Sequence, residues 1–400
     1  MLCSYCVNMN LLTRRGLLFV LAVASFSFVF VKEIHASSFD KQSSVSTKYE
    51  TQDWSFEQRG PILAIGDVHA DPYSLIDILI RAGVINSKGL FVAHERGKFS
   101  HIVFLGDYAD KGPYTRGVWD LLLFLEKETS KHGIDLILHV GNHDKMIQLE
   151  NFTRMEEADL VYFSENSFGA ETAEIGVSRT VLQSPYKKLM ERMRLMTRIG
   201  RYFFVHASFG DPDYFMDFMD RNGIGEFNRV YTQFVVDQHE NLRSKLEGVR
   251  RDVTEVHPLL EYWDFKSPQG PSGLPNTPLW SRDLMNGKFD SDKLTEIMER
   301  LEVDLIVHGH TVTKSREPSF NFGGATLDLD TNISGSYLRK DSRASLSAAI
   351  LDETGGVEIL SSAKDSGFKR GLNSEAYHWF RTRLSPSSKH CEVQFLYSNN

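Results

Sequence analysis

Five short segments place side chains that bind metals or transfer protons directly after an apolar run. They read GDVHAD at 66–71, GDYADKG at 106–112, GNHD at 141–144, HAS at 206–208 and HGHT at 308–311. Short apolar runs bounded by glycine or polar residues are typical of buried strands. A side chain just past the carboxyl end of a strand projects into the crevice where α/β folds bind ligands. The five segments are therefore expected to meet at one edge of a sheet.

The donor set of these segments is that of a metal site. Its members are Asp67, His69, Asp107, Asn142, His206 and His310. Oxygen and imidazole donors without a thiolate favour Mn, Fe or Zn over a soft metal. One such aspartate is usually a turn residue, and one buried histidine is usually a core residue. Five segments of the same design indicate a site.

The five segments resemble the motifs of the calcineurin-like metallophosphoesterase superfamily, which read GD-x-H, GD-x-x-D, GNH-[DE], H-[AG] and GH. The second segment resembles the GDYVDRG motif of the phosphoprotein phosphatase branch. The chain is most similar to the Shewanella-like protein phosphatases in its GHT ending, in a Trp-x-Arg element (Trp280 to Arg282) and in a late Asp-Thr stretch at 330–334. The resemblance implies an α/β fold of two packed mixed β-sheets flanked by helices (αββα), with helical insertions forming a cap.

The resemblance also implies two divalent metal ions (Mn, Fe or Zn). It assigns the first ion to Asp67, His69 and Asp107. Asp107 would bridge to the second ion, which adds Asn142, His206 and His310. In this family a hydroxide that bridges the two ions attacks the phosphorus of a phosphate monoester.

The resemblance gives further residues a role at the substrate. His143 is expected to be the general acid, with Asp110 orienting it. Arg282, Lys111 and Asn142 are expected to bind the substrate phosphate, with Arg282 as a bidentate clamp. Arg282 has a plainer interpretation as a surface residue that follows a buried tryptophan.

Three positions depart from the family pattern. Ala70 replaces a glycine, and Asp144 replaces a glutamate. Asp144 either holds His143 or is structural, and the sequence leaves both open. Lys111 replaces an arginine, which keeps the charge but loses the planar fork that matches a phosphate. This leaves phosphate esters other than phosphoserine and phosphothreonine open as substrates.

The composition is that of an acidic globular protein. The net charge is −8 and 41% of the residues are hydrophobic. This charge does not favour a nucleic-acid partner bound through its phosphates. Because one donor set runs from Asp67 to His310, we expect a single metallophosphoesterase domain over 59–362, followed by a C-terminal tail at 363–400.

The first 36 residues have the features of a targeting segment. Arg14 and Arg15 precede an uncharged stretch at 16–31, and small residues follow near Ala36. This predicts a signal peptide, with a twin-arginine form as one version. The alternative is an N-terminal membrane anchor, although 16–31 falls short of the roughly 20 residues that span a bilayer. Both predict an exported, periplasmic or secreted protein.

The polar segment at 37–58 is expected to be a flexible lead-in. Residues 1–36 carry a net charge of +2, so the chain without them would carry −10. It would keep one cysteine, Cys391, and therefore have no intramolecular disulfide.

The remaining patterns predict the elements that position the five segments. Helices are expected at 72–83 and 115–131, between strands, which favours a parallel sheet. Insertions at about 146–200 and 212–265 are expected to be mostly helical, with a looser stretch at 164–183, and are candidates for the cap. Strands at 325–330, 346–352 and 357–360 are expected to form a second sheet.

Three functions fit these observations. The first is a phosphatase acting on phosphoproteins (Ser/Thr or Tyr) or on small phosphate esters. The second is a hydrolase of nucleotides or dinucleoside polyphosphates. The third is a non-catalytic scaffold, against which the presence of His143 and Asp110 argues. The sequence does not indicate an oligomeric state.

Overall fold

The structure is a computed structural model of the chain. It describes residues 54–96, 99–157, 159–160, 173–183, 185–247, 277–333 and 345–362. The expected signal or anchor, most of the lead-in and the C-terminal tail lie outside these residues, so those expectations remain predictions. Within the described part of the chain, no helix combines the length and the hydropathy needed to cross a membrane.

Five strands form the first sheet. In spatial order they are β11 (Val357–Ser361), β10 (Ser347–Leu351), β2 (Ile62–Ile65), β3 (His101–Phe104) and β4 (Asp135–Leu138). β2, β3 and β4 are parallel and in register, so that Ile65 pairs with Phe104 and Phe104 with Leu138. The first three motif segments therefore leave the sheet at one level.

Six strands form the second sheet. In spatial order they are β1 (Ser55–Phe56), β5 (Met196–Ile199), β6 (Tyr202–Val205), β7 (Leu305–His308), β9 (Thr326–Asp328) and β8 (Ser319–Asn321). β6, β7 and β9 run parallel. The last two motif segments follow β6 and β7, so they also emerge at one edge.

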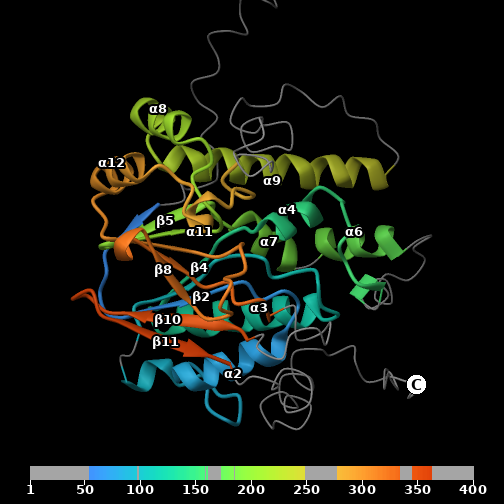
Figure 1. The fold of residues 1–400 in the computed structure, drawn as a ribbon. Helices are drawn as coiled ribbons and strands as arrows, with labels where there is room; N and C mark the ends of the chain where they lie inside the picture. The colour runs from blue at the N-terminus through green and yellow to red at the C-terminus, as the bar shows by residue number, and fades with distance from the viewer. Residues whose placement is uncertain are drawn as a thin grey trace, which may run out of the picture. The chain divides into compact units, whose positions relative to one another are not determined.

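The two sheets pack face to face across an apolar layer (Figure 1). Side chains alternate along each strand because successive residues point to opposite faces. Ile62 and Ala64 lie in the layer between the sheets, together with Phe204 of β6 and Val307 of β7. Leu63 belongs to the outer core beneath the helices.

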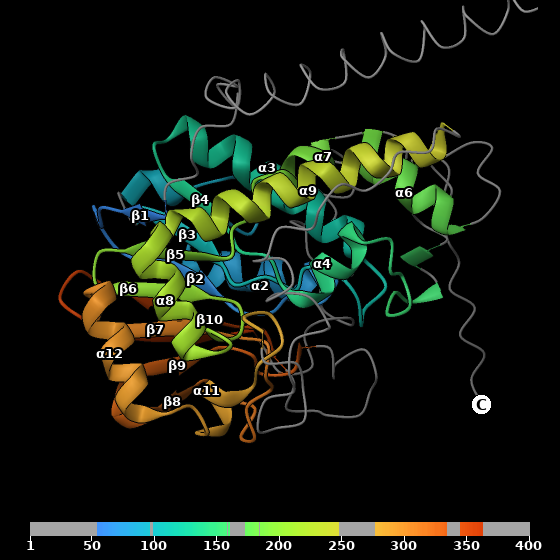
Figure 2. The same cartoon turned by 90° about the horizontal axis from the view of Figure 1, so that it is seen from above.

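Helices cover the outer faces of both sheets (Figure 1). α2 (Pro72–Ala82) and α3 (Thr115–Lys131) lie against the five-stranded sheet. α9 (Gly225–Leu246) crosses the other side, as Figure 2 shows from above. There Asn228 of α9 donates from Nδ2 to the carbonyl of Met196 in β5 over 2.9 Å. The fold is thus two mixed sheets flanked by helices, which confirms the predicted fold class.

The other helices surround this framework. They are η1 (Ala93–Arg96), α4 (Asn142–Gln148), α6 (Ala173–Gln183), α7 (Pro185–Glu191), α8 (Pro212–Asn222), α11 (Asp283–Asn286), α12 (Ser291–Leu301) and η2 (Phe322–Gly324).

The sequence signals at the ends of α2 explain where this helix begins and ends. The Asp71 side chain accepts hydrogen bonds from the backbone N–H groups of Tyr73 and Ser74, each over 3.0 Å. Proline is favoured at the first helical position and glycine just past the last. Here Pro72 begins the helix, and Gly83 closes it with φ 72°. Both α2 and α3 confirm the sequence-based helices.

The structure corrects one expectation about the sheets. β10 and β11 were expected in the second sheet, but β10 pairs antiparallel with β2, and Ala349 faces Ala64 in the register. Without β10, β2 would be an edge strand with unpaired backbone groups. The sheet that carries the first metal motif is therefore completed by residues almost 300 positions later.

Three further segments differ from expectation. α6 fills 173–183, part of the stretch expected to be loose, and β5 lies inside the insertion expected to be helical. β1 falls within the expected lead-in and pairs parallel with β5. For β1 and β5, pairing with other strands outweighs a weak local pattern. α8 and α9 fit the second helical insertion as far as it is described.

Candidate metal centre and catalytic site

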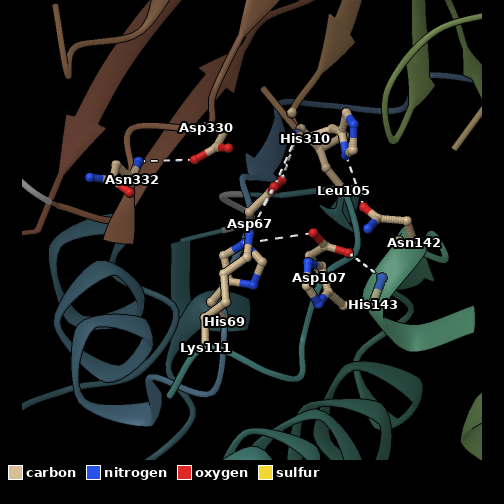
Figure 3. A network of polar contacts seen from close by, with 12 residues as sticks. Asp67, His69, Leu105, Asp107, Lys111, Asn142, His143, His310, Asp330 and Asn332 are labelled. Atoms are coloured by element: carbon tan, nitrogen blue, oxygen red, sulfur yellow. Dashed lines mark hydrogen bonds and ion pairs between the residues drawn. The ribbon is translucent and has the colours of Figure 1, made fainter. Parts of the chain in front are cut away.

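The five motif loops meet at the carboxyl edge of the strands. Figure 3 shows polar side chains of four of these loops pointing toward one another. His69 donates its backbone N–H to the carbonyl of Asp107 over 2.8 Å. His143 donates its backbone N–H to Asp107 Oδ1 over 3.0 Å. His310 does the same to Asp67 Oδ2 over 3.0 Å, which joins loops from the two sheets. The predicted donor residues are thus brought together.

Asp107 lies between two groups of ligand atoms. Its Oδ2 is 3.6 Å from His69 Nε2, and its Oδ1 is 3.5 Å from His206 Nε2. In the described residues, two triads have potential ligand atoms within 4.8 Å of one another: Asp107 with His69 and His143, and Asp107 with His206 and His310. Ligand atoms about 2.0–2.2 Å from a metal ion lie some 3–4 Å apart. The two carboxylate oxygens of Asp107 therefore face two adjacent candidate cation positions.

Asn142 belongs to the second of these positions. Its Oδ1 is 3.1 Å from His206 Nε2 and 2.8 Å from His310 Nδ1. All three side chains are buried. One amide oxygen and two imidazole nitrogens thus converge beside Asp107 Oδ1.

The three predicted histidine ligands are oriented in the same way. Each places its second ring nitrogen against a backbone carbonyl, which accepts a hydrogen bond from that nitrogen. The pairs are His69 Nδ1 with Ala109 (3.2 Å), His206 Nδ1 with Leu105 (2.8 Å) and His310 Nε2 with Trp280 (3.2 Å). Such contacts fix which nitrogen is left to bind a cation. The other ring nitrogen in each case is the one that faces the site.

Electrostatics also fit a cation. Burial lowers the pKa of His69, His206 and His310, which keeps these rings in the neutral form that binds metals. Burial, and then the carboxylates of Asp330 and Asp107, raise the pKa of Asp67. Carboxylates crowded in this way are stabilised by a divalent cation. Asp67 Oδ2 is 3.9 Å from His69 Nε2, so Asp67 belongs with His69 at the first position.

His143 and Asp110 form a separate pair. His143 Nδ1 is 2.7 Å from Asp110 Oδ2, and both side chains are buried. Since Asp110 engages Nδ1, only Nε2 of His143 is left to face the site. Nε2 either binds a cation, as the first triad allows, or transfers a proton. The firm hydrogen bond to a carboxylate is the arrangement expected of a general acid or base.

Two cationic side chains border the site. Lys111 Nζ is 3.0 Å from His69 Nε2, on the side of the first position. Arg282 directly precedes α11. The pKa of His310 is lowered mainly by burial, then by the charge of His206 and then by that of Arg282, so Arg282 lies near His310. The expected phosphate-binding residues thus lie near both cation positions.

Backbone strain is concentrated in the same loops. Residues other than glycine with positive φ include His69 (44°), Asp107 (52°), Asp110 (65°), Lys111 (59°) and His310 (69°). This conformation is costly for such residues and is typical of functional sites. Ala70 shares this conformation, with φ 55°, at the position where the family pattern has a glycine.

Close approach explains two motif glycines. A Cβ atom at Gly141 would overlap Asp107 Oδ1, and one at Gly309 would overlap Asp67 Oδ1. Glycine at these positions lets the backbone come up against the carboxylates.

The structure favours one interpretation of Asp144. Its carboxylate accepts hydrogen bonds from the backbone N–H groups of Tyr108 (3.0 Å) and Gly141 (2.9 Å). It therefore ties the second motif loop to the third, which is the structural role.

Sequence reasoning missed the carbonyls of Leu105, Ala109 and Trp280. Every residue carries a carbonyl, so no residue type signals these contacts. His308 is buried and lies outside both triads, as expected for a neighbour of the ligand rather than a ligand.

The chain is similar to several known proteins. Residues 60–314 match the model of the calcineurin-like phosphoesterase family. Shewanella-like protein phosphatase 1 of Plasmodium berghei is 24% identical over 287 residues, which cover 70% of this chain and 67% of that protein. An uncharacterised protein of Schizosaccharomyces pombe is 30% identical over 106 residues, only 26% of this chain and 31% of its own.

A solved structure shares the fold. The cold-active protein-tyrosine phosphatase of a psychrophilic Shewanella species superposes with a TM-score of 0.52 at 17% identity, covering 78% of this chain and 84% of that one. The two sheets, the convergent metal-binding residues and the match over more than half the chain define a metallophosphoesterase. The chain belongs to the calcineurin-like phosphoesterase family, and it is a hydrolase.

Proposed function

We propose that the chain is a dinuclear metal-dependent phosphatase that hydrolyses phosphate monoesters on phosphoproteins. The observation that carries the proposal is the position of Asp107, which belongs to both triads and faces a histidine of each with a different oxygen. The relative from Plasmodium berghei, named a protein phosphatase, supports the substrate class.

Asp67, His69 and Asp107 would hold one cation, and Asp107, Asn142, His206 and His310 the other. When bound, two divalent cations supply positive charge that polarises the phosphate ester and activates water for in-line attack. Mn, Fe and Zn all suit these donors.

The side chains around the cations would bind and orient the substrate. Arg282 can clamp phosphate oxygens, and Asn142 can donate to them from its amide nitrogen. That nitrogen, Nδ2, is buried and has no hydrogen-bond partner in the described part of the chain. His69 Nε2 has a single lone pair, so it can accept a hydrogen bond from Lys111 Nζ or bind a cation, but not both. With a cation there, Lys111 is free to turn to the phosphate.

His143 would act on the leaving group. Asp110 holds its Nδ1, so that Nε2 carries the proton donated to the leaving oxygen. Proton donation by a positioned side chain contributes about 10²–10⁴-fold to a rate.

The test is hydrolysis by the Ser37–Asn400 chain with Mn²⁺ and, in parallel, Fe²⁺ or Zn²⁺. Phosphotyrosine, phosphoserine and phosphothreonine peptides are offered beside a dinucleoside tetraphosphate. We expect phosphopeptide turnover that Asp107→Asn abolishes. Turnover of the dinucleotide alone would move the protein to the second function class. Bound metal without any turnover would instead support a scaffold.

A further inference from the structure

A sixth strand end reaches the metal centre. β9 runs parallel to β7, so its carboxyl end lies at the same edge as the motif loops. A Cβ atom at Gly66 would be 2.5 Å from the carbonyl oxygen of Leu329, which shows how tightly the two strand ends meet. The residues that follow are Asp67 on one side and Asp330 on the other, and Figure 3 shows their carboxylates next to each other.

The backbone and one oxygen of Asp330 are held on three sides. Its N–H donates to Asp328 Oδ1 over 2.9 Å, and its carbonyl accepts from the N–H of Thr313 over 2.9 Å. Its Oδ1 accepts from the N–H of Asn332 over 2.9 Å. Thr313 lies three residues after the predicted ligand His310. Asp330 is therefore fixed to the loop that carries this ligand.

The other oxygen of Asp330 has no such partner. Asp330 is 2% exposed, and its Oδ2 is buried without a hydrogen bond in the part of the chain that the structure describes. An unsatisfied buried polar atom destabilises the folded state, and more so when it is charged. A carboxylate oxygen kept in this state next to a metal centre points to a ligand.

The charges around Asp330 support a cationic ligand. Burial raises the pKa of Asp330, while the charge of Lys111 opposes this rise. Asp67, Asp107 and Asp330 then place three carboxylates around one ammonium group. Lys111 alone leaves a charge of −2 among these groups, which a divalent cation would offset.

We propose that Asp330 is a positioning residue of the metal centre, and that its Oδ2 accepts a hydrogen bond from a water molecule on the cation held by Asp67, His69 and Asp107. We place water between Asp330 and this cation because Asp330 lies outside both triads and, unlike Asp67, forms no ion pair with a predicted histidine ligand in the described residues. Three side chains are proposed to hold this cation, so water would complete its coordination. The inference rests on the proposed metal site and adds a residue to it.

The test is the affinity of the metal-free protein for Mn²⁺, measured by titration calorimetry in Asp330→Asn. This variant keeps an acceptor for the N–H of Asn332 and removes the charge. Loss of such an outer contact typically weakens metal binding 10–100-fold. We expect a loss of this size for one of the two cations, with the other changed less.

Asp328→Asn is the matched control. Asp328 is equally buried, and its Oδ2 also has no partner among the described residues, but it lies within β9. We expect this variant to bind Mn²⁺ with wild-type affinity. If Asp330→Asn fails to fold, Asp330→Ser replaces it, because the serine hydroxyl can still accept from Asn332.

Wild-type affinity of a folded Asp330 variant for both cations would overturn the proposal, as would equal losses in the two aspartate variants. Since the readout is Mn²⁺ binding, it decides the role of Asp330 whether or not phosphopeptides are hydrolysed. Failure of phosphopeptide hydrolysis with two cations bound would contradict only the proposed function.

Discussion

Asp107 is the side chain of this site whose position is fixed by contacts from both sheets. Asp107 accepts from the backbone of His143, faces His69 with one oxygen and His206 with the other, and adopts a strained φ of 52°. A residue held in this way cannot shift toward one cation position without leaving the other. The site is therefore built around a carboxylate whose place is set by both sheets.

The general acid role of His143 can be tested through the leaving group. In His143→Gln, kcat is expected to fall about 10²–10⁴-fold for phenyl phosphate, whose leaving oxygen needs a proton. For 4-nitrophenyl phosphate, whose leaving group departs as the anion, the fall should be much smaller. Steady-state kinetics with both substrates measures this difference.

The metal content of the same variant separates the two interpretations of His143. If Nε2 served as a ligand, His143→Gln would lose a cation and both substrates would be affected alike. Two bound metal ions per chain, measured by atomic emission, together with a leaving-group dependence would establish proton transfer.

At the scale of elements, one contact ties the first insertion to the catalytic loop. Thr115 begins α3, and its backbone N–H donates over 3.1 Å to Asp159 Oδ1, which comes from beyond the third motif. Tyr114, at the capping position of α3, provides no side-chain cap of its own. Asp159 thus caps the helix that follows Asp110 and Lys111, and it lies close enough to Asp110 to feel its charge.

Asp159 should make the stability of the protein depend on pH. Burial raises the pKa of Asp159 to about 7, against roughly 4 in an unfolded chain. The folded state then binds this proton more tightly. The resulting stability is fully present below pH ~4 and is lost as the pH rises toward 7.

Asp159→Asn should remove this dependence, because the amide oxygen can still accept from Thr115 while no charge develops. We expect the unfolding free energy of the wild type, relative to the variant, to fall by a few kcal/mol between pH 4 and 7. Urea unfolding at several pH values gives both curves. Parallel curves would show that Asp159 does not titrate in this range.

For the whole molecule, the donor set joins two sheets that otherwise meet through an apolar layer. Asp67, His69, Asp107 and Asn142 follow strands of the five-stranded sheet, while His206 and His310 follow strands of the six-stranded sheet. The second cation, held by ligands from both groups, would cross-link the sheets. Binding to the folded state alone stabilises it by about 2.7 kcal/mol when the free cation is 100 times its Kd.

Metal removal should therefore lower the melting temperature. We expect chelation to reduce Tm by several degrees and Mn²⁺ to restore it. His310→Gln should reduce the restoration, whereas His308→Gln, in a buried histidine two residues away, should not. Differential scanning calorimetry of the three proteins measures these shifts. A wild-type Tm that is the same with chelator and with Mn²⁺ would contradict the cross-link.

The residue types of the site and their places in the chain could be predicted from the sequence alone. Each of the five segments follows an apolar run, and the runs before Asp67, Asp107, Asn142, His206 and His310 are strands in the structure. α2 and α3 were equally predictable, since their apolar periodicity and, for α2, its end signals are local. Local signals of this kind need no knowledge of distant residues.

The contacts that complete these parts are visible only in the folded chain. The pairing of β10 with β2, the carbonyls behind the histidines and the approach of Asp330 to Asp67 each join residues that are far apart in the chain. Every residue carries a backbone carbonyl, so the sequence does not mark which carbonyls contact the histidines. The local sequence of a strand likewise does not specify which sheet the strand joins. Such contacts arise from the packing of the two sheets, which no single segment specifies.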